Sequence, residues 1–210
     1  MNAGRIFEAV YVALLTNLLL ALACAPLVLV VLTTDPGRTW PLLVLFAPLG
    51  GPALVAAFAV LRAVSDGEVW RVFWTAWRTS ARPALTAGSL ATVALLVLGV
   101  DAAWLAGRPA GAVLLPVIAV VMTLIVITTV LTLVALAERP DARLRDLARA
   151  GAYLGLRRWY LSLFSLVVLV LFEVLLAARP AIAIGVAASP LLYIVWANSR
   201  FTLTTNGRTT

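Results

Sequence analysis

The stretch AGAVLLPVIAVVMTLIVITTVLTLVALA, residues 110–137, contains no charged residue. A helix of this length extends for about 42 Å, whereas roughly 20 apolar residues are enough to cross the ~30 Å of hydrocarbon in a bilayer. The stretch therefore predicts a membrane-spanning helix.

Five further apolar segments surround this one, at 8–32, 41–61, 84–106, 159–178 and 180–197. Only ARPA separates the last two, which allows a tight hairpin or one broken segment, and we favour the hairpin. With 63% hydrophobic residues, 12% charged residues and a mean hydropathy of +1.07, the chain is too apolar for a soluble domain of 210 residues. We expect an all-α fold: a polytopic membrane helical bundle of about six transmembrane helices, formed by a single domain over residues 1–210.

The first apolar run resembles a signal peptide only in part. It continues past Cys24 to Leu32, which is longer than the apolar core of a secretory signal. We therefore expect it to be a membrane span.

Arginine placement predicts the orientation of the spans, because cytoplasmic loops retain positive charge. With the N-terminus inside, only Arg38, Arg108 and Arg179 lie outside. Thirteen arginines then lie in the cytoplasm, at positions 5, 62, 71, 78, 82, 139, 143, 145, 149, 157, 158, 200 and 208. We expect both termini to be cytoplasmic and the protein to be in a bacterial plasma membrane. The outer arginines recur every 70 or 71 residues, which leaves open either an internal repeat or the average spacing of three hairpins.

The segment DGEVWRVFWTAWRTSARP, residues 66–83, predicts an amphipathic cytoplasmic helix between the second and third spans. On a helical wheel its aromatic residues share one face beside an arginine stripe. Ser65 or Asp66 is the expected N-cap, and Pro83 the expected end. The aromatic residues are Trp70, Phe73, Trp74 and Trp77, and the arginines are Arg71, Arg78 and Arg82.

Aromatic and arginine side chains in this arrangement are typical of the bilayer interface, where guanidinium groups reach anionic headgroups. Packing of the aromatic face under the bundle and a partner-docking groove are the alternatives. Nucleic-acid binding is not expected, because the neighbouring spans offer the aromatic rings a nearer apolar partner.

A second cytoplasmic amphipathic helix is predicted at about 141–156. Its polar face carries Arg145 and Arg149, and the spacing predicts ion pairs of Asp141 with Arg145 and of Asp146 with Arg149. We expect this helix, like the first, to be a cytoplasmic contact surface.

Polar residues within the predicted spans are candidates for function inside the membrane. Asn17 and several threonines can bond between helices or back to their own backbone. Asp101 and Glu173 are acidic residues inside the predicted spans; each is a candidate proton or cation site, or can pair with Arg108 or Arg179, respectively. The sequence APLGGP, residues 47–52, interrupts the second span and predicts a kink or a broken helix.

Residues that would support catalysis do not form a recognisable pattern. There is no nucleophile with a base, no phosphate-binding loop and no group of metal ligands, and Cys24 is the only cysteine. We expect no enzymatic activity and no cofactor.

The chain resembles the YesL-like family of bacterial membrane proteins, a domain of unknown function, over roughly residues 8–200. Leu54 and Val55 depart from the family's smaller or hydroxylated residues. The matching features are Asn17, Pro52 and the small residues to Phe58 and Arg62, Asp66-Gly67, and Phe73, Trp74, Trp77 and Arg78.

This resemblance implies an accessory or partner role in carbohydrate uptake, because members of the family are often encoded beside components of carbohydrate ABC transporters. The alternative is a transporter permease subunit in which the helix at 141–156 docks an ATPase.

Overall fold

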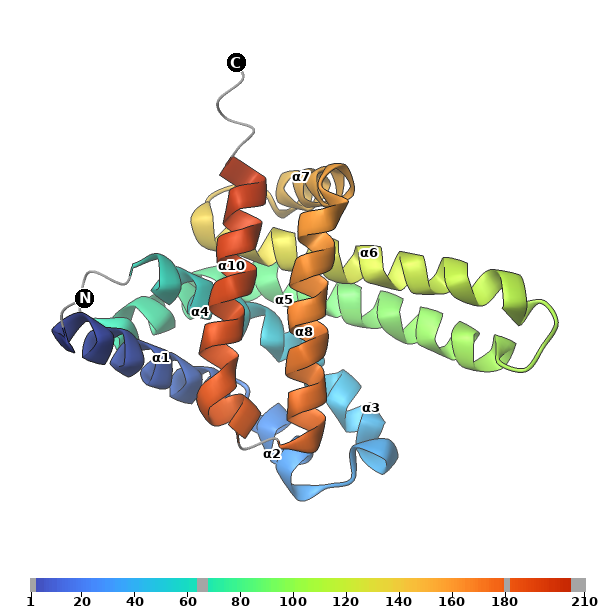
Figure 1. Ribbon diagram of the computed structural model, residues 1–210, viewed down its shortest axis with the longest axis horizontal. Helices are drawn as coiled ribbons and strands as arrows, with labels where there is room; N and C mark the ends of the chain where they lie inside the picture. Colours follow the sequence, from blue (N-terminus) through green and yellow to red (C-terminus); the bar gives the residue numbers. More distant parts are fainter. Residues whose placement is uncertain (1–2, 64–67, 180–181, 205–210) are drawn as a thin grey trace, which may run out of the picture.

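The computed structural model describes residues 3–63, 68–179 and 182–204, and this part of the chain is helical without a strand. Figure 1 shows two antiparallel helix pairs, α5–α6 and α8–α10, that cross each other, with the helices of the N-terminal third packed around the crossing. The all-α fold expected from the sequence is confirmed.

The first predicted span is broken into two helices. α1 covers Ala3–Ala23 and α2 covers Ala25–Thr33, and the two are bent by 85° at the break. Pro26 lies in the first turn of α2, where a missing N–H costs no hydrogen bond, and the helix direction changes at Cys24. The segment expected as one span over 8–32 is therefore a bent pair of helices.

The second predicted span contains α3 at Pro36–Phe46, the 3₁₀ turn η1 at Ala47–Leu49 and α4 at Gly50–Arg62. The APLGGP stretch forms η1 and the first residues of α4, so the chain remains helical through it. Residues Gly51–Leu61 are buried with the exception of Leu54, so α4 is the central helix of the bundle.

The predicted amphipathic helix and the third span form one continuous helix. α5 runs over Val69–Leu105, and Pro83 lies inside it. The expected end at Pro83 was wrong, because burial on both sides of this residue holds the helix: Phe73 and Ser80 are buried before it and Ala84 after it. The expected caps at residues 65 and 66 lie outside the described residues.

α6 covers Gly111–Glu138 and pairs with the second half of α5 in a long hairpin (Figure 1). The hairpin exposes valine and leucine side chains along both helices, whereas Leu131–Ala137 at the far end of α6 are buried. α6 is therefore anchored in the core at its C-terminal end, and the hairpin projects from it.

The C-terminal part consists of α7 at Leu144–Arg157, α8 at Trp159–Ala178, the π-helix η2 at Ala183–Ala187 and α10 at Ala188–Thr204. α8 and α10 lie side by side, with Asn198 bonded to the Leu161 carbonyl, so the expected hairpin is confirmed.

Within the described residues, four helical stretches are long and apolar enough to cross a membrane. They are Gly37–Arg62, Val69–Leu105, Gly111–Glu138 and Trp159–Ala178, and the bent α1–α2 pair would make a fifth if it crosses as one unit. These helices indicate insertion into a membrane.

Candidate functional site

Glu138 joins the ends of three helices. Arg62 Nη1, at the end of α4, donates a hydrogen bond of 3.2 Å to the Glu138 carbonyl oxygen at the end of α6. Arg200 Nε on α10 lies 3.9 Å from Glu138 Oε1, and its guanidinium lies 5.3 Å from the centre of the Trp196 ring. We call this region, where α4, α6 and α10 end and α5 begins, the basic end of the bundle.

A hollow of about 580 Å³, the end cavity, opens at the basic end between α4, α5 and the α6–α7 loop. Val55, Ala59 and Leu136 give it an apolar floor. Its polar residues are Arg62, Glu68, Arg71, Thr75, Thr79, Ser80 and Asp141. The volume is typical of ligand pockets, and the mixture of both charges suits a polar partner or ligand more than an apolar one.

The aromatic residues of α5 form an edge-to-face ladder. Trp70 and Trp74 have ring centres 5.6 Å apart, and Trp74 and Trp77 5.5 Å apart. Phe73 is fully buried, Trp74 and Trp77 are half-buried against the core, and Trp70 is 55% exposed. Trp74 and Trp77 thus pack under the bundle, whereas Trp70 remains accessible.

The arginines of α5 lie on its exposed side. Arg71 Nη1 is paired with Glu68 Oε2 at 3.0 Å, while Arg78 and Arg82 have no ion pair within the described part of the chain. A shallow hollow of about 810 Å³, the α5 groove, follows this side and is lined by Trp70, Arg71, Trp74, Thr75, Arg78 and Thr79.

α7 packs against α6 through two glycines four residues apart. A Cβ atom on Gly155 would lie 2.9 Å from Ile127 Cγ2, and one on Gly151 would lie 3.3 Å from the Thr128 carbonyl oxygen. This close approach turns Arg145 and Arg149 outward. The ion pairs predicted for them with Asp141 and Asp146 are absent from the described residues, where all four side chains are exposed to solvent that screens their attraction.

Asn17 on α1 holds α10 at its irregular start. Its Nδ2 donates to the Gly185 carbonyl oxygen at 3.0 Å, and its Oδ1 accepts from the Ser189 N–H at 2.7 Å. In an α-helix these two backbone groups would bond to each other, but the π-helix breaks that pairing, because the Ala188 N–H reaches back to Ala183. The Asn17 amide therefore replaces the missing backbone bond.

The threonines behave differently from Asn17. Thr16, Thr129 and Thr132 each donate to a carbonyl four residues earlier in their own helix. Of the two arrangements that the sequence left open, the threonines adopt the intrahelical one and Asn17 adopts the interhelical one.

Asp101 and Glu173 are both exposed and lie on different helices, α5 and α8. Neither forms an ion pair within the described residues, and Arg108, the expected partner of Asp101, stacks over the Trp104 ring at 3.3 Å. The structure does not bring the two acids together with other ligating groups: no cluster of three Cys, Asp or Glu residues occurs in its described part.

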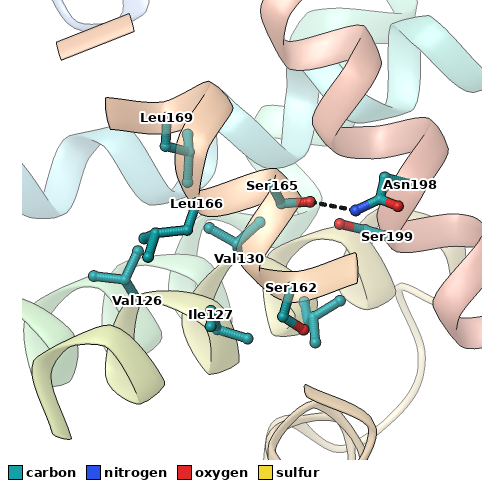
Figure 2. Close-up of a pocket in the computed structure, with 10 residues that line it drawn as sticks. Val126, Ile127, Val130, Ser162, Ser165, Leu166, Leu169, Asn198 and Ser199 are labelled. Atoms are coloured by element: carbon teal, nitrogen blue, oxygen red, sulfur yellow. Dashed lines mark hydrogen bonds between the residues drawn. The ribbon is translucent and has the colours of Figure 1, made fainter. Parts of the chain in front are cut away.

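Figure 2 shows a second polar cluster, between α6, α8 and α10. Asn198 Nδ2 donates to Ser165 Oγ at 2.7 Å and to the Leu161 carbonyl oxygen at 2.6 Å, and Ser162 Oγ donates to the Gly155 carbonyl oxygen at 3.2 Å. The cavity beside them has a volume of about 10 Å³, close to the space of one water molecule. This cluster ties the C-terminal hairpin together and leaves no room for a larger ligand.

Sequence reasoning missed Glu138, Arg62 and Asn198 as members of these clusters. Asn198 gave a signal, a polar residue at the end of an apolar segment. Glu138 and Arg62 gave no such signal. Each is a charged residue at the end of a span, as is common, and the two are 76 positions apart in the sequence.

Comparison of the chain with protein-family models, with curated proteins and with solved structures gave no match. The resemblance to the YesL-like family therefore stays a prediction from the motifs.

Proposed function

We propose that this chain is a non-enzymatic integral protein of the bacterial plasma membrane that serves as an accessory subunit in carbohydrate uptake. In this proposal it crosses the membrane six times, with both termini in the cytoplasm. The four long apolar stretches, the bent α1–α2 pair and the α8–α10 hairpin support the six crossings. The helical residues 182–204 are about 34 Å long, which is enough for the sixth crossing.

The end cavity is the observation that carries the proposal. It combines an apolar floor with both signs of charge, and Thr75 and Asp141 on its wall are exposed. The basic end corresponds to the cytoplasmic side of the predicted topology, where a partner subunit would meet it. The link to carbohydrate uptake rests on the family resemblance alone.

A photo-crosslinking experiment tests the subunit role. A benzoylphenylalanine at Asp141, on the wall of the end cavity, is expected to crosslink to a membrane component of a carbohydrate transporter in living cells. The matched control is Ala112, which is exposed at the opposite end of α6. Identification of the crosslinked protein as unrelated to transport, or equal crosslinking from both positions, would overturn the proposal.

A second candidate function is a permease subunit with α7 as the helix that docks an ATPase. The observation that favours it is the firm seating of α7 on α6 through Gly151 and Gly155, with Arg145 and Arg149 directed outward. Co-purification of an ATPase that is lost in Arg145→Glu/Arg149→Glu but retained in Arg71→Glu would select this function over the accessory role.

A further inference from the structure

One face of α5 changes character along its length. At 100° per residue, Arg71, Arg78 and Arg82 lie within about 60° of Ser89, Val93 and Val100 on the helix circumference. All six side chains are exposed. The same face is thus basic in its first half and apolar in its second half, because α5 continues through Pro83.

The two ends of the apolar half are separated by the thickness of a bilayer. Arg82 and Trp104 are 22 residues apart, or about 33 Å along the axis, against ~30 Å of hydrocarbon. Trp104 is exposed and stacks with Arg108, a pair typical of a membrane boundary. Arg82 accordingly marks the opposite boundary on the same helix.

Arg82 and Arg78 are available to a ligand at that boundary. They are one helical turn apart, both are exposed, and neither has an ion pair within the described residues. Arg71 lies about 16 Å from Arg82 along the axis and is paired with Glu68. Its guanidinium lies beyond the few ångströms of the headgroup layer unless α5 is strongly tilted.

We infer that Arg78 and Arg82 bind the phosphate of an anionic phospholipid in the leaflet at the basic end, with its acyl chains along the same face as far as Val93, about 16 Å from Arg82. This inference rests on the membrane insertion in the proposed function and names the lipid that the exposed arginine face of α5 receives. Two guanidinium groups one turn apart can both donate hydrogen bonds to one phosphate. Thr79, beside Arg78 on the α5 groove, lies nearest to the headgroup.

A lipid explains this face better than an acidic protein segment does. An acidic segment would account for the arginines but not for the exposed apolar row that continues them on the same face. A phospholipid has the same order of groups, an anion followed by ~15 Å of hydrocarbon in each leaflet. The arginines and the face as far as Val93 therefore match one phospholipid, and Val100 lies at the level of the opposite leaflet.

Native mass spectrometry of the full-length protein, released from nanodiscs of equal phosphatidylglycerol and phosphatidylcholine, tests the inference. The wild type is expected to retain phosphatidylglycerol preferentially. Arg78→Gln/Arg82→Gln should reduce that preference by about 30-fold, from the usual contribution of two arginines near anionic lipid. Arg145→Gln/Arg149→Gln removes the same charge from α7 and should leave the preference unchanged.

Arg78→Lys/Arg82→Lys keeps the charge without the planar guanidinium and should retain part of the preference. Tryptophan fluorescence during thermal unfolding checks that each variant is folded. Equal retention of the two lipids by the wild type, or equal losses in the α5 and α7 variants, would overturn the inference. Either result would leave the crosslinking at Asp141, and with it the proposed function, unaffected.

Discussion

Asn17 and Asn198 hold α10 from two sides by bonding to backbone groups of other helices. A buried amide is expensive to leave unpaired, and its hydrogen bonds between helices are therefore specific to one arrangement. Asn17 forms hydrogen bonds with the Gly185 carbonyl oxygen and the Ser189 N–H. These two groups lack their usual helical partners, because Pro190 and the π-helix interrupt the regular backbone hydrogen bonds at the start of α10. These two residues therefore fix the position of α10, because its apolar surface alone would allow several packing arrangements.

Replacing Asn17 with alanine should lower the free energy of unfolding by about 1–3 kcal/mol, because it leaves the Ser189 N–H and the Gly185 carbonyl without partners. Thr16→Val is the matched control: Thr16 is equally buried, but its hydroxyl bonds only within α1. Unfolding in mixed micelles of increasing dodecyl sulfate content measures both. Equal losses in the two variants would show that Asn17 contributes only packing.

At the level of elements, charged residues and turns in the sequence predicted helix ends well where tertiary packing did not override these local signals. The ends of α6 and α8 agree with the predicted segments to within a residue. Pro83 and Cys24 show where local signals fail. Burial around Pro83 overrides its preference to end a helix, and the bend at Cys24 occurs inside an apolar run that only Pro26 interrupts.

The continuity of α5 predicts a distance. Spin labels at Arg78 and Val93, introduced after replacing Cys24 with alanine, should be separated by about 22 Å along the axis, since the two positions are 15 residues apart on one helix. Pro83→Ala should leave this distance unchanged and raise stability by about 1–3 kcal/mol, because it restores a backbone N–H to the helix interior. A shorter, broadly distributed distance in the wild type would mean that two helices meet at Pro83.

The candidate site was predictable only in part, because some of its features depend on contacts between segments that are distant in the sequence. The arginine and tryptophan faces follow from helical periodicity and could be read from positions 66–83 alone. The end cavity could not, because it forms where segments around Arg62, Arg71 and Asp141 meet, and no local pattern encodes that meeting. Which tryptophans are buried was likewise decided by α4 packing on one side of α5.

On the scale of the whole molecule, the two helix pairs cross, and no single plane is perpendicular to both (Figure 1). α6 is about 42 Å long, so it can tilt by about 40° and still cross ~30 Å of hydrocarbon. α8, about 30 Å long, can tilt less without thinning the bilayer. In Figure 1 the start of α1, the end of α10 and α7 lie toward the left and top. The turn between α5 and α6 lies toward the right, and the lower ends of α8 and α10 lie toward the bottom. A bilayer between these two groups would receive both hairpins obliquely.

Cysteine labelling tests that placement. In a Cys24→Ala background, Thr75→Cys should react with an impermeant maleimide only in inverted membrane vesicles, and Ala103→Cys only in intact cells, because the two exposed positions lie at opposite ends of α5. Labelling of position 75 from outside intact cells would reverse the predicted orientation.

The bridge from Asn17 to Ser189 also imposes an order on biosynthesis. The two residues are 172 positions apart, and a ribosome adds roughly 5–20 residues per second, so about 10–30 s pass between their syntheses. During that interval the amide of Asn17 is already in place while its partners do not yet exist. α1 thus keeps an unoccupied docking point until α10 has been synthesised.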